Sequence, residues 1–176
     1  MKKYVLAAAL AAGLAAPAMA QDDAAFTGFR VEALIGYDNA NVPTIKNPDG
    51  VVYGVGAGYD FALGGTVLGV EAEASDSTAK TNLGGGFHVK AGRDLYVGGR
   101  AGVVVGSGLL YAKAGYTNAR ITLTGVGSAN GDGVRGGVGY EFALSGKMYG
   151  KVEYRYSNYE AGLSRNQGVV GFGVRF

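Results

Sequence analysis

The charged residues of this 176-residue chain recur at every second position within short segments. Arg30 precedes Glu32 in this way, and Glu71 precedes Glu73. Because alternate residues of a β-strand point to the same side, each pair is expected on one face of a sheet. Opposite charges collected inside a closed sheet would either neutralise one another as ion pairs or line a narrow path for ions.

The same alternation places seven basic and six acidic residues on one face of their segments. Glycines between them leave room for long side chains to cross a lumen. A closed ionic core and a water-threaded ion path would use the same side chains, so the sequence leaves both open. This predicted lumen charge network comprises Arg30, Glu32, Asp60, Glu71, Glu73, Arg100, Lys113, Arg135, Glu141, Lys151, Glu153, Arg155 and Arg175.

Other chemistry has little support in the sequence. His88 is the single histidine, and Ser75, Asp76 and Ser77 fall in the same predicted loop, so a hydrolase triad is geometrically open. The local Ser–His pattern of lipid-modifying barrels is absent, however, and haem ligation by His88 has no further support. We expect a plain loop histidine and no catalytic residue.

The segment Gly131–Gly136 spells G-x-G-x-x-G, but no helix or βαβ unit follows it, so dinucleotide binding is rejected. The absence of cysteine removes disulfides and zinc-thiolate sites. No acidic or histidine cluster has metal-ligand spacing, so neither a metal nor a cofactor is expected.

Composition favours a single β-rich domain. Glycine accounts for 33 of the 176 residues, far above the usual ~7 %, and follows no three-residue period. The hydrophobic content of 48 % excludes disorder.

The first twenty residues have the pattern of a secretory signal peptide. Lys2 and Lys3 precede an apolar stretch, Pro17 ends it, and Ala18-Met19-Ala20 forms a cleavage site. We expect residues 1–20 to be removed after Ala20, leaving residues 21–176 as the barrel domain. Loss of the two lysines leaves fourteen basic and fourteen acidic residues, and hence no basic surface for nucleic acid.

Eight segments with period-two alternation account for most of the remainder. Tight glycine turns at 62–65, 106–108 and 144–146 alternate with longer polar connections at 38–50, 76–86, 124–132 and 160–166. This pattern predicts an all-β fold, an eight-stranded antiparallel up-and-down transmembrane β-barrel. The segments are 29–37, 53–61, 68–75, 95–105, 110–116, 135–142, 151–156 and 170–176.

The aromatic residues decide between a membrane barrel and a soluble one. Phenylalanines 29, 61, 142 and 176 fall beside the short turns, whereas tyrosines 37, 53, 116 and 156 fall beside the long connections. Two such girdles are typical of a membrane barrel. A secreted, lipocalin-like barrel that binds a ligand is the weaker alternative.

The sequence Gly58–Leu63 recurs, with one acidic exchange, as Gly139–Leu144, 81 positions later. Half-barrel duplication explains this repeat, and so does a shared constraint at a membrane boundary.

The segments Leu109–Tyr116, Val152–Tyr156 and Gly171–Phe176 resemble the small outer-membrane β-barrel proteins of Gram-negative bacteria. The likeness is strongest to their alphaproteobacterial, opacity-protein-like branch, which is similar to the barrel of outer membrane protein A. In that family a C-terminal assembly signal is recognised, and Gly171, Val174 and Phe176 match it. Val169 departs from it, because the family has a polar residue there.

The resemblance implies an integral protein of the cell outer membrane with a largely closed, charge-paired lumen. Its role would be envelope integrity or surface interaction, with a narrow passive porin for ions and small solutes as the alternative. The implied partners are outer-membrane lipid and lipopolysaccharide, the barrel assembly machinery, and an extracellular or host ligand, with no nucleic acid; we expect a monomer. The ligand would bind at loop residues 39–47, 76–82, 124–132 and 160–165.

Overall fold

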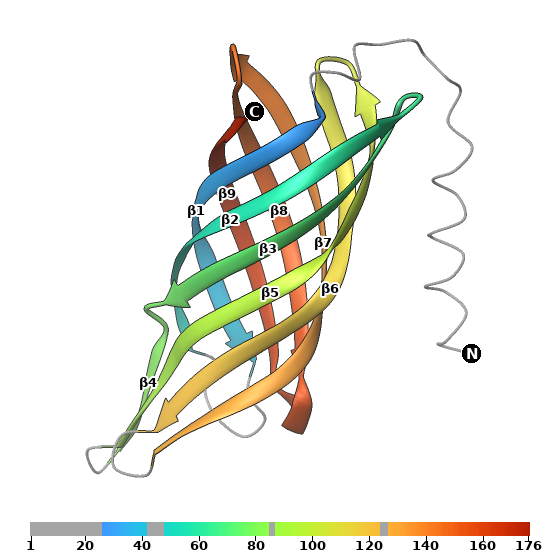
Figure 1. Ribbon diagram of the computed structural model, residues 1–176. Helices are drawn as coiled ribbons and strands as arrows, with labels where there is room; N and C mark the ends of the chain where they lie inside the picture. Colours follow the sequence, from blue (N-terminus) through green and yellow to red (C-terminus); the bar gives the residue numbers. More distant parts are fainter. Residues whose placement is uncertain (1–25, 42–47, 85–86, 124–126) are drawn as a thin grey trace.

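The computed structural model describes residues 26–41, 48–84, 87–123 and 127–176, almost all of them in strands (Figure 1). The predicted signal peptide and its cleavage site lie outside the described residues. The strands are β1 (Gly28–Asn41), β2 (Asp49–Leu63), β3 (Thr66–Ser77), β4 (Lys80–Gly84), β5 (Phe87–Val105), β6 (Gly108–Leu123), β7 (Gly127–Ser145), β8 (Met148–Tyr159) and β9 (Ser164–Arg175). A 3-10 turn (Glu160–Gly162) separates β8 from β9.

Antiparallel pairing closes these strands into a barrel. Strands that follow one another in sequence pair, except for β3 and β4; in addition β1 pairs with β9, and β3 pairs with β5. The short β4 follows β3 along the same edge of β5, so the two segments occupy one position in the wall. The predicted eight-stranded antiparallel barrel is therefore confirmed, with a break at Thr78 and Ala79 in its third position. At this break the Ala79 N–H donates to Ser77 Oγ (3.2 Å).

The two ends of the barrel differ in their connections. Two-residue turns centred on Gly64-Gly65, Gly106-Ser107 and Gly146-Lys147 join strands at one end. Gly64, Gly65, Gly106 and Gly146 have φ values of 59°, 85°, 63° and 56°, the left-handed conformation that tight hairpins require. The start of β1 and the C-terminus lie at this short-turn end, at the top of Figure 1. The opposite end is called the long-loop end.

At the long-loop end the connections are shorter than the sequence predicted. Residues 38–41 belong to β1 and residues 127–132 to β7, although both were expected in loops. Asparagine, aspartate and glycine favour turns locally, but cross-strand pairing overrides that preference here. Asn39 pairs with Asp49, for example, and its Nδ2 donates to Asp49 Oδ1 (2.9 Å).

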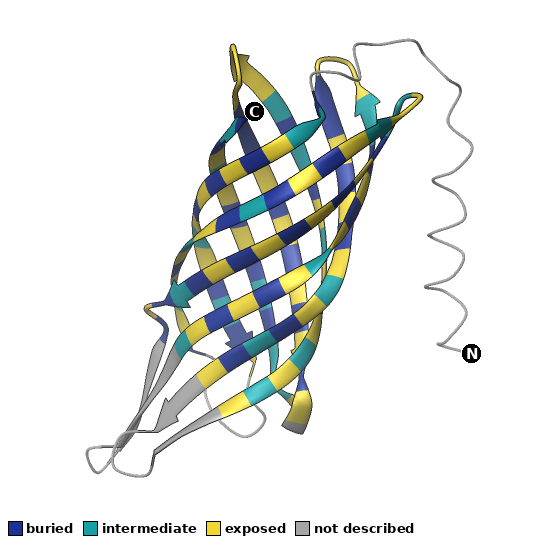
Figure 2. Ribbon diagram, viewed as in Figure 1, coloured by how far each residue is buried: buried dark blue, intermediate teal, exposed yellow. Residues whose placement is uncertain are grey.

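Buried and exposed residues alternate along the strands whose burial is described, as Figure 2 shows, because successive side chains of a strand point to the lumen and to the outer surface. The outward residues form an apolar belt of valine, leucine, isoleucine and alanine. Phe29, Phe61 and Phe176 are exposed near the short turns, and Phe142 is half-buried. The four girdle tyrosines are all exposed on the outer surface. No helix within the described ranges has the length and apolar character needed to cross a membrane.

The belt can be tested at Val138, an outward residue in the middle of the apolar part of β7 that is 56 % exposed. If the belt faces lipid, Val138→Arg should lower the free energy of unfolding in vesicles by about 2–4 kcal/mol. Urea unfolding of the refolded protein measures this change. Ser107→Arg, in a short turn, is the control and should cost little. A soluble barrel would tolerate both substitutions equally.

Candidate functional site: the charged lumen

The lumen holds all thirteen residues of the predicted charge network, each no more than 6 % exposed. Three further charged residues are buried with them: Asp38, Asp94 and Arg165. The seven-to-six balance inferred from the sequence was therefore wrong. Among the described residues the lumen contains eight basic and eight acidic groups, which leaves it formally neutral.

At the short-turn end, two carboxylates bind two arginines jointly. Arg100 Nε donates to Asp60 Oδ1 (2.8 Å) and its Nη1 to Glu141 Oε2 (3.0 Å). Arg175 Nη1 contacts Asp60 (2.7 Å) while its Nη2 contacts Glu141 (2.5 Å). Arg30 Nε adds a third cation to Asp60 at 3.0 Å. Each carboxylate is thus paired across the lumen, which offsets the cost of burying its charge.

The internal sequence repeat supplies these two carboxylates. Asp60 belongs to the first copy, on β2, and Glu141 to the second, on β7. Both acids bind Arg100 and Arg175, so the two copies meet through shared partners inside the barrel. A common requirement for an inward acid just before a short turn is therefore sufficient to explain the repeat.

The middle of the lumen is a denser cluster around two lysines. Lys113 Nζ lies 2.8 Å from Glu71 Oε1 and 3.0 Å from Glu153 Oε1, and it also contacts Glu73. Lys151 Nζ donates to Glu32 Oε1 (2.5 Å). Because each ammonium group can donate three hydrogen bonds, one lysine can serve carboxylates from several strands.

Two residues that were predicted to lie in loops, Asp38 and Arg165, help to close the long-loop end. Arg165 pairs with Asp38 on β1 and, at 3.4 Å, with Asp94 on β5. Gln167 Nε2 donates to Asp38 Oδ1 (3.0 Å). Arg135 Nη2 donates to Asp94 Oδ2 (2.5 Å). The period-two alternation of β1 and β9 places Asp38 and Arg165 on the inward face. The sequence would have predicted both as lumen residues if the two predicted strands had been extended to include them.

The three clusters form one continuous network. Arg30 contacts Glu71 and lies 3.3 Å from Glu32, which joins the short-turn cluster to the middle. Arg135 Nη1 lies 3.8 Å from Glu73, which joins the middle to the long-loop cluster. Charge pairing therefore extends through the lumen from one end to the other.

Buried tyrosines complete the network. Tyr111 donates to Glu153 (2.7 Å), Tyr149 to Glu32 (2.8 Å) and Tyr159 to Asp94 (2.8 Å). The Lys113 ammonium lies 4.7 Å from the centre of the Tyr96 ring. The sequence interpretation assigned functional meaning only to outward tyrosines, so this contribution was missed.

Inward glycines provide the space for these long side chains. A Cβ atom at Gly171 would lie 2.9 Å from Lys151 Cε, and one at Gly58 would lie 2.9 Å from Arg30 Nη2. The high glycine content is thus a packing requirement of a narrow lumen filled by arginine and lysine.

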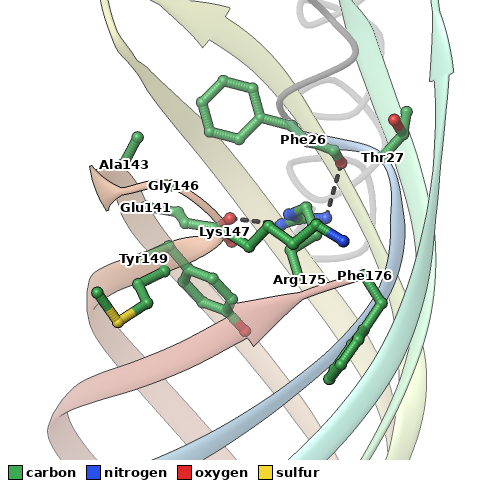
Figure 3. Close-up of a pocket in the computed structure, with 10 residues that line it drawn as sticks. Phe26, Thr27, Glu141, Ala143, Gly146, Lys147, Tyr149, Arg175 and Phe176 are labelled. Carbon is green, nitrogen blue, oxygen red and sulfur yellow. Dashed lines mark hydrogen bonds and ion pairs between the residues drawn. The ribbon is translucent and has the colours of Figure 1, made fainter.

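Phe26, just before β1, covers the lumen at the short-turn end. Its side chain is buried with Val67, Leu109 and Tyr111. Arg175 Nη1 donates to its carbonyl oxygen (2.8 Å). A pocket of about 210 Å³ remains beside it, lined also by Lys147 and Phe176 (Figure 3). Figure 3 shows Arg175 between Phe26 and Glu141, so the pocket ends at the ionic cluster.

The arrangement fills the lumen with paired charges. In the part of the chain that the structure describes, no group of acidic or histidine residues could hold a metal ion. Tyr96 OH and Arg155 Nη2 are buried without a hydrogen-bond partner, so each provides a polar position that a water molecule could occupy.

The shared pairing at the short-turn end predicts strong energetic coupling. Arg100→Met leaves buried carboxylates short of a partner and should lower the free energy of unfolding by about 3–5 kcal/mol. Adding Glu141→Gln removes one of those charges, so the double variant should lose less than the sum of the single losses, by about 0.5–3 kcal/mol. Urea unfolding in vesicles measures the cycle, with exposed Lys147→Met as control. Additive losses would contradict the shared pairing.

Comparison of this chain with known proteins agrees with the barrel geometry. Similar solved structures include Neisserial surface protein A (17 % identity, TM-score 0.62, covering 85 % of this chain and 98 % of the other). Ail of Yersinia pestis, in a complex with sucrose octasulfate, has 17 % identity and a TM-score of 0.59, covering 85 % and 99 %. At this identity the two structures support the fold alone.

A relative in sequence is the 25 kDa outer-membrane immunogenic protein of Brucella ovis, which is 32 % identical over 146 residues, covering 80 % of this chain and 72 % of the relative. The same-named protein of Brucella canis is 31 % identical over 147 residues, covering 80 % and 66 %. Residues 6–176 match the outer membrane protein beta-barrel domain family. The chain therefore belongs to that family and is an integral β-barrel protein of the outer membrane.

Proposed function

We propose that this protein is a non-conducting barrel that supports the envelope and presents a surface outside the cell. The observation that carries the proposal is the lumen, in which sixteen buried charges pair from end to end. Moving an ion through it would require separating pairs inside a low-dielectric interior, and breaking a single buried pair costs about 3–5 kcal/mol.

The orientation follows from the connections. Outer-membrane barrels have short periplasmic turns and longer extracellular connections, so the short-turn end faces the periplasm. The long-loop end then provides the surface for an extracellular or host ligand. Strand extension leaves less loop there than the sequence suggested, and exposed strand residues such as Asn41 and Asp49 form part of that surface.

Backbone register argues against the serine–histidine chemistry considered from the sequence. Ser75 pairs with Asp94, six positions from His88 along β5, or roughly 20 Å. Ser77 Oγ donates to Asp38 inside the lumen (2.6 Å). The outer membrane enzyme PagL has a similar fold (16 % identity, TM-score 0.51), but that likeness carries no catalytic residue over. We infer that the protein is not an enzyme.

The same proposal assigns the C-terminal assembly signal to the barrel assembly machinery. Phe176 is exposed at the short-turn end, and its ring lies 6.0 Å from that of Phe29 on β1. Val174 is half-buried on the outer face of β9, and Gly171 is inward beside Lys151. The aromatic residue is thus accessible at the seam that closes the barrel. Closure of that seam within one chain supports a monomer.

A narrow passive porin is the second candidate, and one observation favours it. The unpartnered Tyr96 OH and Arg155 Nη2 are both inside the lumen, where bound water would begin a hydrated path. Water at two positions is insufficient for conduction unless the paired charges at both ends also separate.

Single-channel recording in a planar bilayer tests the proposal. The refolded protein, with folding confirmed by heat-modifiable gel migration, should give no discrete current steps. Regular, salt-dependent steps from the folded protein would contradict the closed lumen and favour the porin.

A charge-balanced variant supplies the positive control. Arg155 Nη1 pairs with Glu73 Oε2 at 2.5 Å, and replacing both with alanine shortens two long side chains without changing net charge. If packing closes the lumen, the double variant should show current steps where the wild type shows none. Silence of a folded double variant would mean that these side chains are not the barrier.

A further inference from the structure

The two residues that precede the first strand form a short strap across the short-turn end of the barrel. Phe26 and Thr27 belong to no strand, and β1 begins directly after them at Gly28. The side chain of Phe26 is buried in a cluster with Val67 on β3 and Leu109 on β6. In the closed wall β6 lies four places from β1 in either direction, so it is the strand opposite β1. The strap therefore spans the mouth of the lumen.

Phe26 occupies an apolar socket, in which its side chain is only 4 % exposed. The socket residues are Val67, Val104, Leu109 and Tyr111. The short-turn ionic cluster lies directly beside the socket, because the Arg100 guanidinium carbon is 5.0 Å from the centre of the Tyr111 ring. On the β3, β5 and β6 side of the mouth, Phe26 thus separates the paired charges from the water outside.

Gly28 has the backbone conformation of a hinge between the strap and the wall. Its φ is 101°, a value that residues with a side chain rarely adopt. A Cβ atom at this position would also clash with the carbonyl oxygen of Phe176. Pairing of β1 with β2 begins at Gly28, so rotation of the chain before it would leave the strand ladder intact.

Release of the strap would not separate any ion pair of the short-turn cluster. The carbonyl oxygen of Phe26 accepts a hydrogen bond from Arg175 Nη1 (2.8 Å). Arg175 also contacts Asp60 (2.7 Å) and Glu141 (2.5 Å), and both contacts are independent of the strap. The pocket of about 210 Å³ beside Phe26 reaches the same arginine, so water can replace the lost carbonyl (Figure 3). The strap is thus easier to displace than the charged side chains beneath it.

We propose that Phe26 and Thr27 form a hinged plug, which closes the periplasmic mouth of the lumen when Phe26 is in its socket and opens by swinging outward about Gly28. Opening admits water to the short-turn cluster, whereas the lysine cluster in the middle of the lumen stays closed. The plug regulates access to the lumen, and it rests on the proposed function for the periplasmic orientation of this end.

The absence of cysteine from the chain allows one introduced thiol to report on the plug. Val67→Cys places this thiol in the socket, where Val67 is 0 % exposed. In the refolded protein in detergent micelles, a water-soluble maleimide should label the thiol slowly, and roughly tenfold faster or more when Phe26→Ala is added. Phe29→Ala, which truncates an outward aromatic residue of β1, is the control and should leave the rate unchanged. An unchanged rate in Phe26→Ala would overturn the plug.

A second thiol position separates motion of the plug from opening of the whole barrel. Val169→Cys lies in another buried apolar cluster, with Leu34 and Val52, and outside the socket. If the plug moves alone, Phe26→Ala should accelerate labelling at Val67→Cys and leave labelling at Val169→Cys unchanged. Equal acceleration of both thiols would overturn the hinged plug, as would a folded protein in which Val67→Cys is never labelled.

The hinge has its own matched pair of variants. Gly28→Ala adds a Cβ atom against Phe176 and should displace the strap, so labelling of Val67→Cys should become faster. Gly136→Ala, outward on β7 where the nearest atom to the added Cβ is 3.9 Å away, should leave the rate unchanged. An unchanged rate in Gly28→Ala would overturn the assignment of the hinge. Gel migration confirms that every variant is folded, and Phe26→Leu replaces Phe26→Ala if the latter is not.

These results are separable from the conductance result, because thiol labelling does not measure current. A lumen that conducts would overturn the closed barrel yet leave the effect of Phe26→Ala on labelling intact. A silent lumen with unchanged labelling would overturn only the plug.

Discussion

Pairing of buried charge is the interaction on which the rest of this barrel depends. Eight cations and eight carboxylates fill the lumen, and an unpaired member of such a set would carry a penalty of several kcal/mol. Each strand must therefore place its charges at the height of partners on other strands. The Asp60–Arg100–Glu141–Arg175 cluster joins β2, β5, β7 and β9 in this way, so the ion pairs specify register as well as neutrality.

The lipid that surrounds the barrel imposes a second requirement on the same strands: their outward side chains must be apolar and their backbone groups must be hydrogen-bonded. A backbone group inside a bilayer must find its hydrogen bond within the protein, which closure of β1 onto β9 and of β3 onto β5 provides. Because side chains alternate with period two, a register slip of one residue would expose arginine to lipid and bury valine among charges. One strand register therefore places the charged side chains in the lumen and the apolar side chains in the belt.

Much of this could be predicted because period-two alternation is a local property of the sequence. The phase of Arg30 and Glu32 against Val31 and Ala33 is enough to assign both faces of β1. What could not be predicted depends on pairing between distant segments. Asp38 and Arg165 are in turn-rich stretches, and the backbone pairing of β1 with β9 shows that both strands continue through them. Their salt bridge joins the same two strands inside the lumen. The break at Thr78 and Ala79, and the burial of Phe26 in the lumen, have no local pattern at all.

A lumen filled in this way also determines where function can be located. Arg100 cannot move without taking one partner from Asp60 and one from Glu141, so under the proposed function the interior has little freedom to bind, gate or react. The outer surface has a different character: Arg93 Nη2 lies 3.4 Å from the amide oxygen of Asn118, and four alanines contribute to the lining of an apolar groove across β9, β1, β2, β3 and β5. A rigid, neutral interior fixes the positions of such outward residues. Under the proposed function, any partner would bind the outer surface, and the paired charges of the lumen would keep the strands that carry that surface in register.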